Sequence, residues 1–474
     1  MRRSAASISA SRQCKGILVG RSGNACSSGV GLCAAALLWW LSGSVLGADP
    51  VESAGLAADA ELPASSVVES VDPELPDAPL WPWSGDLGTR SQLSGSWAGT
   101  REALATNGVS FYCDLTQYYQ GVTSGGLARQ FEYGGRGDYL LDFDTQKLWG
   151  WPGGHIDLRG ETRLGQDCNG IDGAISPSNF AMVLPRPGQN VTALTGVQFT
   201  QEISEQLSVF AGKLNLLDGT PTAYRRGMRL NYFWNAGMQN NLTRVFLMPS
   251  SLGAGVTVRD DVEPVFSFYL LDSYYTPTTS GFQTLFANGV VNYGEYRLRT
   301  NWFGLPGHSA FGVLYSNATR TALDTNPYVL LPGFVTGAAL PKKNSAWTVT
   351  YRLDQVVWAD PQDPERGWTL YSDVGLTDGN PNPIRWFANL ALVGTSPIGG
   401  RNQDTVGLGY YHLGITGLPT FQALGLGAEN GVELYYNAAV TPWFHLTPDL
   451  QILDPSKQST ATAVLIGIRG RISF

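Results

Sequence analysis

The stretch GHIDLRGETRLG carries four charged side chains that alternate in sign. Every second position holds one of them: Asp157, Arg159, Glu161 and Arg163. Successive side chains of a β-strand point to opposite faces, so one face would hold all four charges and the other none. A guanidinium group donates hydrogen bonds and a carboxylate accepts them, so the charged face offers both kinds of group with little net charge.

Two kinds of β protein use such a strand. In a water-soluble sandwich the charges would face water and the apolar side would face the core. In an outer-membrane barrel the apolar side would face lipid and the charges would line a water-filled lumen. A secreted soluble lectin is a further alternative, because it would share the aromatic residues described below.

Composition favours a β protein. The 474 residues include 57 Gly, 14 Trp, 20 Tyr and 19 Phe, and only 15% are charged. Beyond the N-terminal region no stretch approaches the roughly 18 consecutive apolar residues of a transmembrane helix. A chain of this kind that crosses a membrane would therefore have to be a barrel.

The N-terminal region predicts export. A basic segment precedes an apolar run that ends in small residues, so residues 1–47 are interpreted as a signal peptide. A single anchoring helix is the alternative, but Gly and Ser interrupt the run. Residues 48–90 form an acidic linker rich in Pro and Ala, and residues 91–474 form the barrel domain.

Charge and cysteine content argue against a nucleic-acid-binding protein and against a disulfide-rich protein. Removing the five basic residues of the leader from 31 leaves 26 against 39 acidic residues, so the mature net charge is about −13. Such a chain, without a basic run, is a poor candidate for binding nucleic acid. Only Cys113 and Cys168 lie outside the leader, which is no disulfide framework, although a single bridge between them stays open.

A short helix and many strands are expected after the linker. Residues 95–108 predict the helix, with Ser96 as its cap and Gly108 at its end. Alternating segments of about ten residues then continue to the C-terminus, which suits about 16 strands around an aqueous channel. Aromatic residues gather at segment ends, as in QKLWGWPGG, NYFWN, TNWFGLPG and VTPWFHL, where interfacial girdles would place them.

Four blocks resemble the OprB family of carbohydrate-selective porins: YYQGVTSGG, EYGGRGDYLLDFD, GLTDGNPNPIRWF and GVELYYNAAVTPWFHLTPDLQIL. The resemblance covers most of the chain after residue 90. It implies an outer-membrane β-barrel through which monosaccharides and related polyols diffuse. The terminal Phe474 resembles the signal that such barrels present to the assembly machinery. A general diffusion porin without sugar preference is the alternative, and monomers and homo-oligomers are both compatible with the sequence.

A neutral sugar offers hydroxyl groups and C–H surface but no charge, so a selective lumen needs donors and acceptors of both signs. On this basis nine residues are candidates for the pore lining: Asp142, Asp144, Asp157, Arg159, Glu161, Arg163, Glu295, Arg297 and Arg299. The alternative is an ion-pair ladder that stiffens the wall without touching solute.

No catalytic or metal site is expected, and no cofactor. A barrel hydrolase would need a His beside a Ser or a carboxylate. The four histidines, His155, His308, His412 and His445, are in no such arrangement. The segment DCNGIDG lacks the bidentate Glu of a calcium loop and is interpreted as an ordinary loop.

Overall fold

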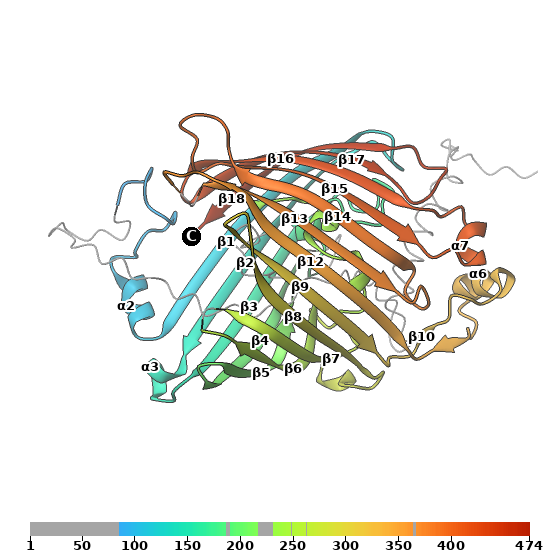
Figure 1. Ribbon diagram of the computed structural model, residues 1–474, viewed down its shortest axis with the longest axis horizontal. Coiled ribbons are helices and arrows are strands. Elements are labelled where there is room, and N and C mark those ends of the chain that lie inside the picture. The colour runs from blue at the N-terminus through green and yellow to red at the C-terminus, as the bar shows by residue number, and fades with distance from the viewer. Residues whose placement is uncertain (1–84, 186–189, 217–230, 248, 262, 364–365) are drawn as a thin grey trace, which may run out of the picture.

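The computed structural model describes residues 85–185, 190–216, 231–247, 249–261, 263–363 and 366–474. Sixteen antiparallel strands close into one barrel, because β1 pairs with both β2 and β18 (Figure 1). The predicted barrel of about 16 strands is thereby confirmed. The barrel strands are β1 (Val109–Ser124), β2 (Phe131–Asp144), β3 (Gly154–Gly165), β4 (Val191–Ser204), β5 (Leu207–Asn215), β6 (Ser250–Arg259), β7 (Pro264–Asp272), β8 (Val290–Trp302), β9 (Leu305–Ser316), β12 (Ala346–Ala359), β13 (Gly367–Thr377), β14 (Ile384–Thr395), β15 (Thr405–Ile415), β16 (Glu429–Thr441), β17 (Phe444–Asp454) and β18 (Ala463–Ser473).

Short and long connections lie at opposite ends of the barrel. Residues 303–304 join β8 to β9, whereas residues 317–345 join β9 to β12 and carry a small sheet and a helix: β10 (Arg320–Thr321), β11 (Lys342–Lys343) and α6 (Pro327–Thr336). In Figure 1 the C-terminus, α2 (Thr100–Thr106) and α3 (Thr145–Trp149) lie at one end, and α6 and α7 (Pro419–Ala423) lie at the other. Short turns of outer-membrane barrels face the periplasm, so we name these the periplasmic end and the outer end.

The wall alternates as the sequence predicts. On β1, Thr116 and Gln120 are buried on the inner side, whereas Tyr119 between them is 50% exposed on the outer side. On β2, Arg136 is fully buried and Tyr133 is 51% exposed. At these positions of β1 and β2, polar groups therefore face inward and apolar groups face outward, as in outer-membrane barrels. Within the described ranges, none of the helices has the length and apolar character needed to span a bilayer.

The hydrophobic core lies in the lumen. Residues 166–185, here called the first inserted segment, follow β3 and contain η1 (Phe180–Met182). Residues 231–247, the second inserted segment, precede β6 and contain α5 (Ala236–Gln239) and η2 (Leu242–Arg244). Apolar side chains of both segments pack together with inward aromatic residues of the wall, including Tyr293, Tyr411 and Tyr435. The two segments therefore narrow the barrel from within.

The N-terminal helix is present but shorter than predicted. Trp97, Ala98 and Gly99 all have positive φ angles, of 51°, 57° and 82°, so these residues form a turn and the helix begins at Thr100. The ring centroid of Trp97 lies 5.8 Å from that of Phe111 on β1. The prediction that Ser96 caps the helix is therefore wrong.

Aromatic residues at strand ends follow the prediction with one exception. Trp149, Trp302 and Trp386 are 64%, 44% and 42% exposed, as expected for an interfacial girdle. The interpretation of NYFWN as interfacial is wrong, because Trp234 is 1% exposed and its ring meets Tyr118 edge-on at 5.4 Å inside the lumen. The remaining short helix, η3 (Phe282–Thr284), lies between β7 and β8.

Cys113 and Cys168 are free, so the bridge left open by the sequence does not form. The Cys168 thiol instead donates to the carbonyl oxygen of Gln120 at 3.1 Å. The predicted signal peptide and residues 48–84 of the predicted linker lie outside the described residues. Residues 85–90 are described, and the indole N–H of Trp443 donates to the Leu87 carbonyl at 2.7 Å.

Candidate functional site

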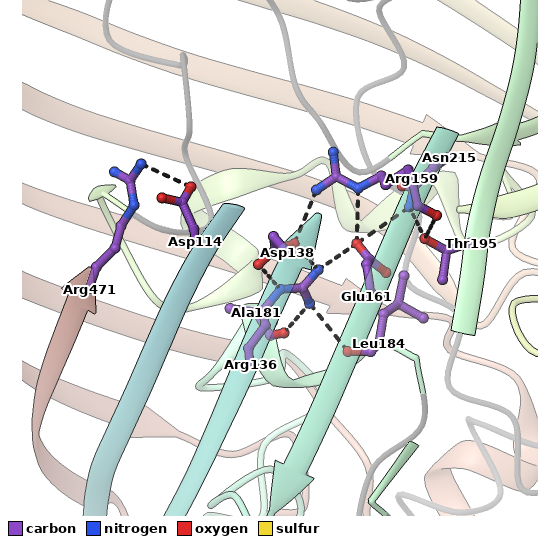
Figure 2. A network of polar contacts seen from close by, with 10 residues as sticks. All are labelled: Asp114, Arg136, Asp138, Arg159, Glu161, Ala181, Leu184, Thr195, Asn215 and Arg471. Carbon is purple, nitrogen blue, oxygen red and sulfur yellow. Dashed lines mark hydrogen bonds and ion pairs between the residues drawn. The ribbon is translucent and has the colours of Figure 1, made fainter. Parts of the chain in front are cut away.

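Charged side chains of β2 and β3 form a ladder on the inner wall, here called the β2–β3 ladder (Figure 2). Arg136 lies between two carboxylates, 2.7 Å from Asp138 and 2.5 Å from Glu161. Arg159 reaches the same two acids, at 3.2 Å and 3.1 Å. Asp138 and Glu161 face each other directly in the strand pairing, and like charges there would repel. Sharing each acid between two arginines offsets that repulsion.

The ladder also holds the first inserted segment against the wall. Arg136 donates through Nη1 to the carbonyl oxygens of Ala181 at 2.6 Å and Leu184 at 3.2 Å. Two positions along β3 from Glu161, Arg163 forms an ion pair with Asp167 at the start of the same segment. Backbone carbonyl groups in a lumen need donors, and the wall arginines supply them.

Exposure separates solute-facing charges from structural ones. The Arg136 and Glu161 side chains are 0% exposed, whereas those of Asp138 and Arg159 are 10% and 13% exposed. Figure 2 also shows an ion pair between Asp114 of β1 and Arg471 of β18 at 3.0 Å, and these side chains are 21% and 18% exposed. Only the partly exposed members can meet a solute in the lumen.

A second group, the β8–β12 network, lies elsewhere on the wall. Arg352 of β12 forms an ion pair with Glu295 of β8, and Arg297 lies 3.5 Å from the same carboxylate. The Tyr293 hydroxyl donates to Glu295 at 2.5 Å and accepts from Arg244 of the second inserted segment at 2.9 Å. All of these side chains are nearly or fully buried. This network fixes the second inserted segment rather than lining an open path.

The nine predicted lining residues thus separate into several places. Arg159 and Glu161 share the β2–β3 ladder, Arg163 lies beside it, and Glu295 and Arg297 share the β8–β12 network. Asp142 and Asp157 face each other across β2 and β3, half-buried on the inner wall.

Two predicted residues lie near the periplasmic ends of their strands, Asp144 at the end of β2 and Arg299 on β8. Asp144 caps α3, accepting from the backbone N–H groups of Gln146 and Lys147 at 3.0 and 3.2 Å. Arg299 is half exposed and forms an ion pair with Asp260 in the turn after β6.

Sequence reasoning missed several inner charges. Arg136 and Asp138 share the parity of Asp142 within EYGGRGDYLLDFD, so the alternation could have identified them. The same holds for Arg352 in WTVTYRLD. Arg244 gave no such signal, because it lies on a loop whose path depends on distant contacts.

Asp172 lies in the first inserted segment and is fully buried. Burial raises its pKa to about 7, and the nearby negative charge of Glu429 acts in the same direction. The backbone N–H of Ala174 donates to Asp172 Oδ1 at 3.0 Å and favours the charged form, but burial outweighs it.

Three of the four histidines contact neighbouring side chains. His308 lies 3.0 Å from Glu263, His412 stacks on Trp386 with ring centroids 4.4 Å apart, and His445 contacts Asn437 at 3.1 Å. Across the part of the chain that the structure describes, no group of three or more His, Cys, Asp or Glu side chains is placed to hold a metal ion.

Solved structures are similar to this chain to different degrees, and the first of them shares its fold. The high-pH structure of Pseudomonas putida OprB matches with a TM-score of 0.69 at 20% identity, covering 82% of this chain and 100% of that chain. Its low-pH structure gives a TM-score of 0.48 at 18% identity, with 82% and 99% coverage. Salmonella typhi OmpF in complex with daunomycin gives 0.43 at 11% identity, with 78% and 98% coverage. No curated protein matches the chain.

The comparison with models of protein families identifies the family. The sequence model described as "Carbohydrate-selective porin, OprB family" matches residues 128–474, which is most of the chain and all of the barrel from β2 onward. Its fold and family indicate a channel rather than an enzyme. The chain therefore belongs to the OprB family of carbohydrate-selective porins and is an outer-membrane barrel through which carbohydrates diffuse.

Proposed function

We propose that monosaccharides and related polyols cross the lumen along six partly exposed charges on β18, β1, β2 and β3, here called the lining track. The observation that carries this proposal is the difference in exposure within the inner ion pairs. The members of the lining track are Asp114, Asp138, Asp142, Asp157, Arg159 and Arg471.

The track suits a neutral solute because it carries both signs of charge on neighbouring strands. Carboxylates accept from sugar hydroxyls and guanidinium groups donate to them. Each carboxylate and guanidinium of the pairs Asp138–Arg159 and Asp114–Arg471 is already partnered. A sugar hydroxyl therefore competes with an existing ion pair, which keeps binding weak, as conduction requires.

The buried candidates have a different proposed role. Four of them stiffen the wall and hold the inserted segments: Glu161, Arg163, Glu295 and Arg297. Asp144 caps α3, and Arg299 binds Asp260 in the turn after β6. We further propose that the chain has no catalytic activity, that its outer wall contacts membrane lipid and further copies of the barrel, and that Phe474 is presented to the assembly machinery. Cross-linking in native membranes would test the association of copies.

Liposome swelling tests carbohydrate passage directly. Proteoliposomes are placed in isotonic glucose, sorbitol, serine or sodium gluconate, and the initial swelling rate is recorded. We expect faster swelling in glucose and sorbitol than in gluconate, which is of similar size but charged. Rates that follow only solute size would support the alternative of a general diffusion porin.

A further inference from the structure

Two glutamates of β16 hold the inserted segments. Glu429 and Glu433 are four positions apart, which places them on the same, inner face of the strand. Both are 0% exposed, so neither can contact a solute. Their carboxylates face the two segments that fold into the lumen.

Each glutamate binds a different segment through backbone amides. Glu429 accepts from the N–H groups of Ile175 at 2.6 Å and Ser176 at 2.9 Å, both in the first inserted segment. Glu433 accepts from the N–H groups of Trp234 and Asn235 in the second, the latter at 3.0 Å. A carboxyl group has two oxygens on one carbon, so it suits a pair of adjacent N–H groups.

The two segments are also bonded to each other. The Ser176 hydroxyl donates to the Asn235 side-chain oxygen at 2.6 Å and accepts from the Gly237 N–H at 2.8 Å. Gln451 of β17 bridges them as well, accepting from Asn235 at 3.1 Å and donating to the Ser178 carbonyl at 2.8 Å. The glutamates, the serine and the glutamine thus join both segments to β16 and β17.

We propose that Glu429 and Glu433 are positioning residues that hold the two inserted segments as one unit and so set the width of the channel. This inference rests on the channel function but not on sugar preference, because the width also governs the passage of ions. Since the segments are bonded to each other, loosening one also loosens the other. The effects of the two glutamates should therefore be less than additive.

The test compares Glu429→Gln, Glu433→Gln and the double variant in planar bilayers with potassium chloride. A glutamine presents one acceptor oxygen, and its NH₂ group would face an N–H, so one amide of each pair loses its partner. We expect open-channel current noise to rise by about twofold or more in each single variant, because a locally destabilised segment opens more often. The control is Glu102→Gln, the same chemical change on an exposed residue of α2. We expect its noise and conductance to equal those of the unaltered chain.

A second variant covers the case in which the glutamine variants fail to assemble. Ser176→Ala leaves the wall glutamates intact and removes two of the hydrogen bonds between the segments, so it too should raise the noise. Unchanged conductance and noise in every variant that assembles would overturn the proposal. A loss of sugar block with unchanged ion current noise would likewise overturn it, since it would place the glutamates in solute binding and not in setting the width.

Discussion

Arg159 and Arg163 lie two positions apart on the inner face of β3 but have different surroundings. Arg159 is partly exposed and shares its two carboxylate partners with Arg136. Arg163 is 0% exposed and paired with Asp167. The sequence pattern treats them alike, so the difference in burial decides which of them a solute can reach.

We expect Arg163→Gln to change the current noise and Arg159→Gln to change the ion selectivity. Arg163→Gln leaves Asp167 buried without its ion-pair partner, which typically costs about 3–5 kcal/mol. The first inserted segment should then detach, and current noise should rise. Arg159→Gln should leave the noise unchanged and shift the reversal potential toward cation selectivity, because the carboxylates then dominate the local field. Equal noise in the two variants would contradict this distinction.

The raised pKa of Asp172 predicts that docking of the first inserted segment depends on pH. The Asp172 pKa of about 7 in the folded protein exceeds the value of about 4 in an unfolded chain, so the folded state binds more protons between these values. Docking of the first inserted segment is therefore most stable below about pH 4 and weakens as the pH rises toward 7. We expect noisier currents at pH 8 than at pH 5, and a smaller difference in Asp172→Asn. An identical pH dependence in that variant would assign the effect to another group.

At the scale of elements, the residues of β3 point alternately toward the lumen and toward the lipid. Leu158 lies between Asp157 and Arg159 and points away from the lumen. We expect Leu158→Arg to cost about 2–4 kcal/mol near the middle of the membrane, whereas lumen substitutions on the same strand cost less. The measurement is the urea concentration at which folded barrel is lost, with Arg159→Gln as the matched comparison. If Leu158→Arg folds as well as Arg159→Gln, the strand faces the other way.

The strands were predictable from the sequence because each one carries its own alternation. The β8 segment sets Glu295 and Arg297 against Tyr296 and Leu298 without reference to the rest of the chain. The inserted segments carry no comparable local signal. Trp234 docks on Glu433, 199 residues away, so its place depends on a closed barrel that must already exist. An aromatic cluster suits a lipid interface and a packed lumen equally well, and for this reason the sequence does not locate NYFWN.

The candidate site was predictable in kind but not in detail. The alternation correctly places Arg159 and Glu161 on one inner face, where they share a ladder. It does not reveal which charges an inserted segment covers, so it does not separate Arg159 from the buried Glu161. The helix at residues 95–108 shows the same limit, because local helical preference does not reveal the positive φ angles of Trp97 and Ala98.

At the scale of the whole molecule, the barrel needs a bilayer because its outer wall is apolar around the full circumference. Side chains such as Val313 and Leu408 are 56% and 55% exposed at mid-strand. We expect the full chain to fractionate with outer membranes and to migrate faster on a denaturing gel before boiling than after it. Recovery as a soluble periplasmic protein would contradict the account.

The central claim is that partly exposed charges on one side of the lumen bind carbohydrate during passage. Glucose titration of the single-channel current tests it in the unaltered chain, in Arg159→Gln and in Arg299→Gln, which removes the same charge near the periplasmic end of β8, outside the lining track. Hydrogen bonds to charged groups contribute about 1.5–3 kcal/mol, so the account predicts that Arg159→Gln weakens glucose block by about tenfold or more. It predicts no change in block for Arg299→Gln. Equal block constants in all three proteins would contradict the claim and would place the sugar path on another part of the wall.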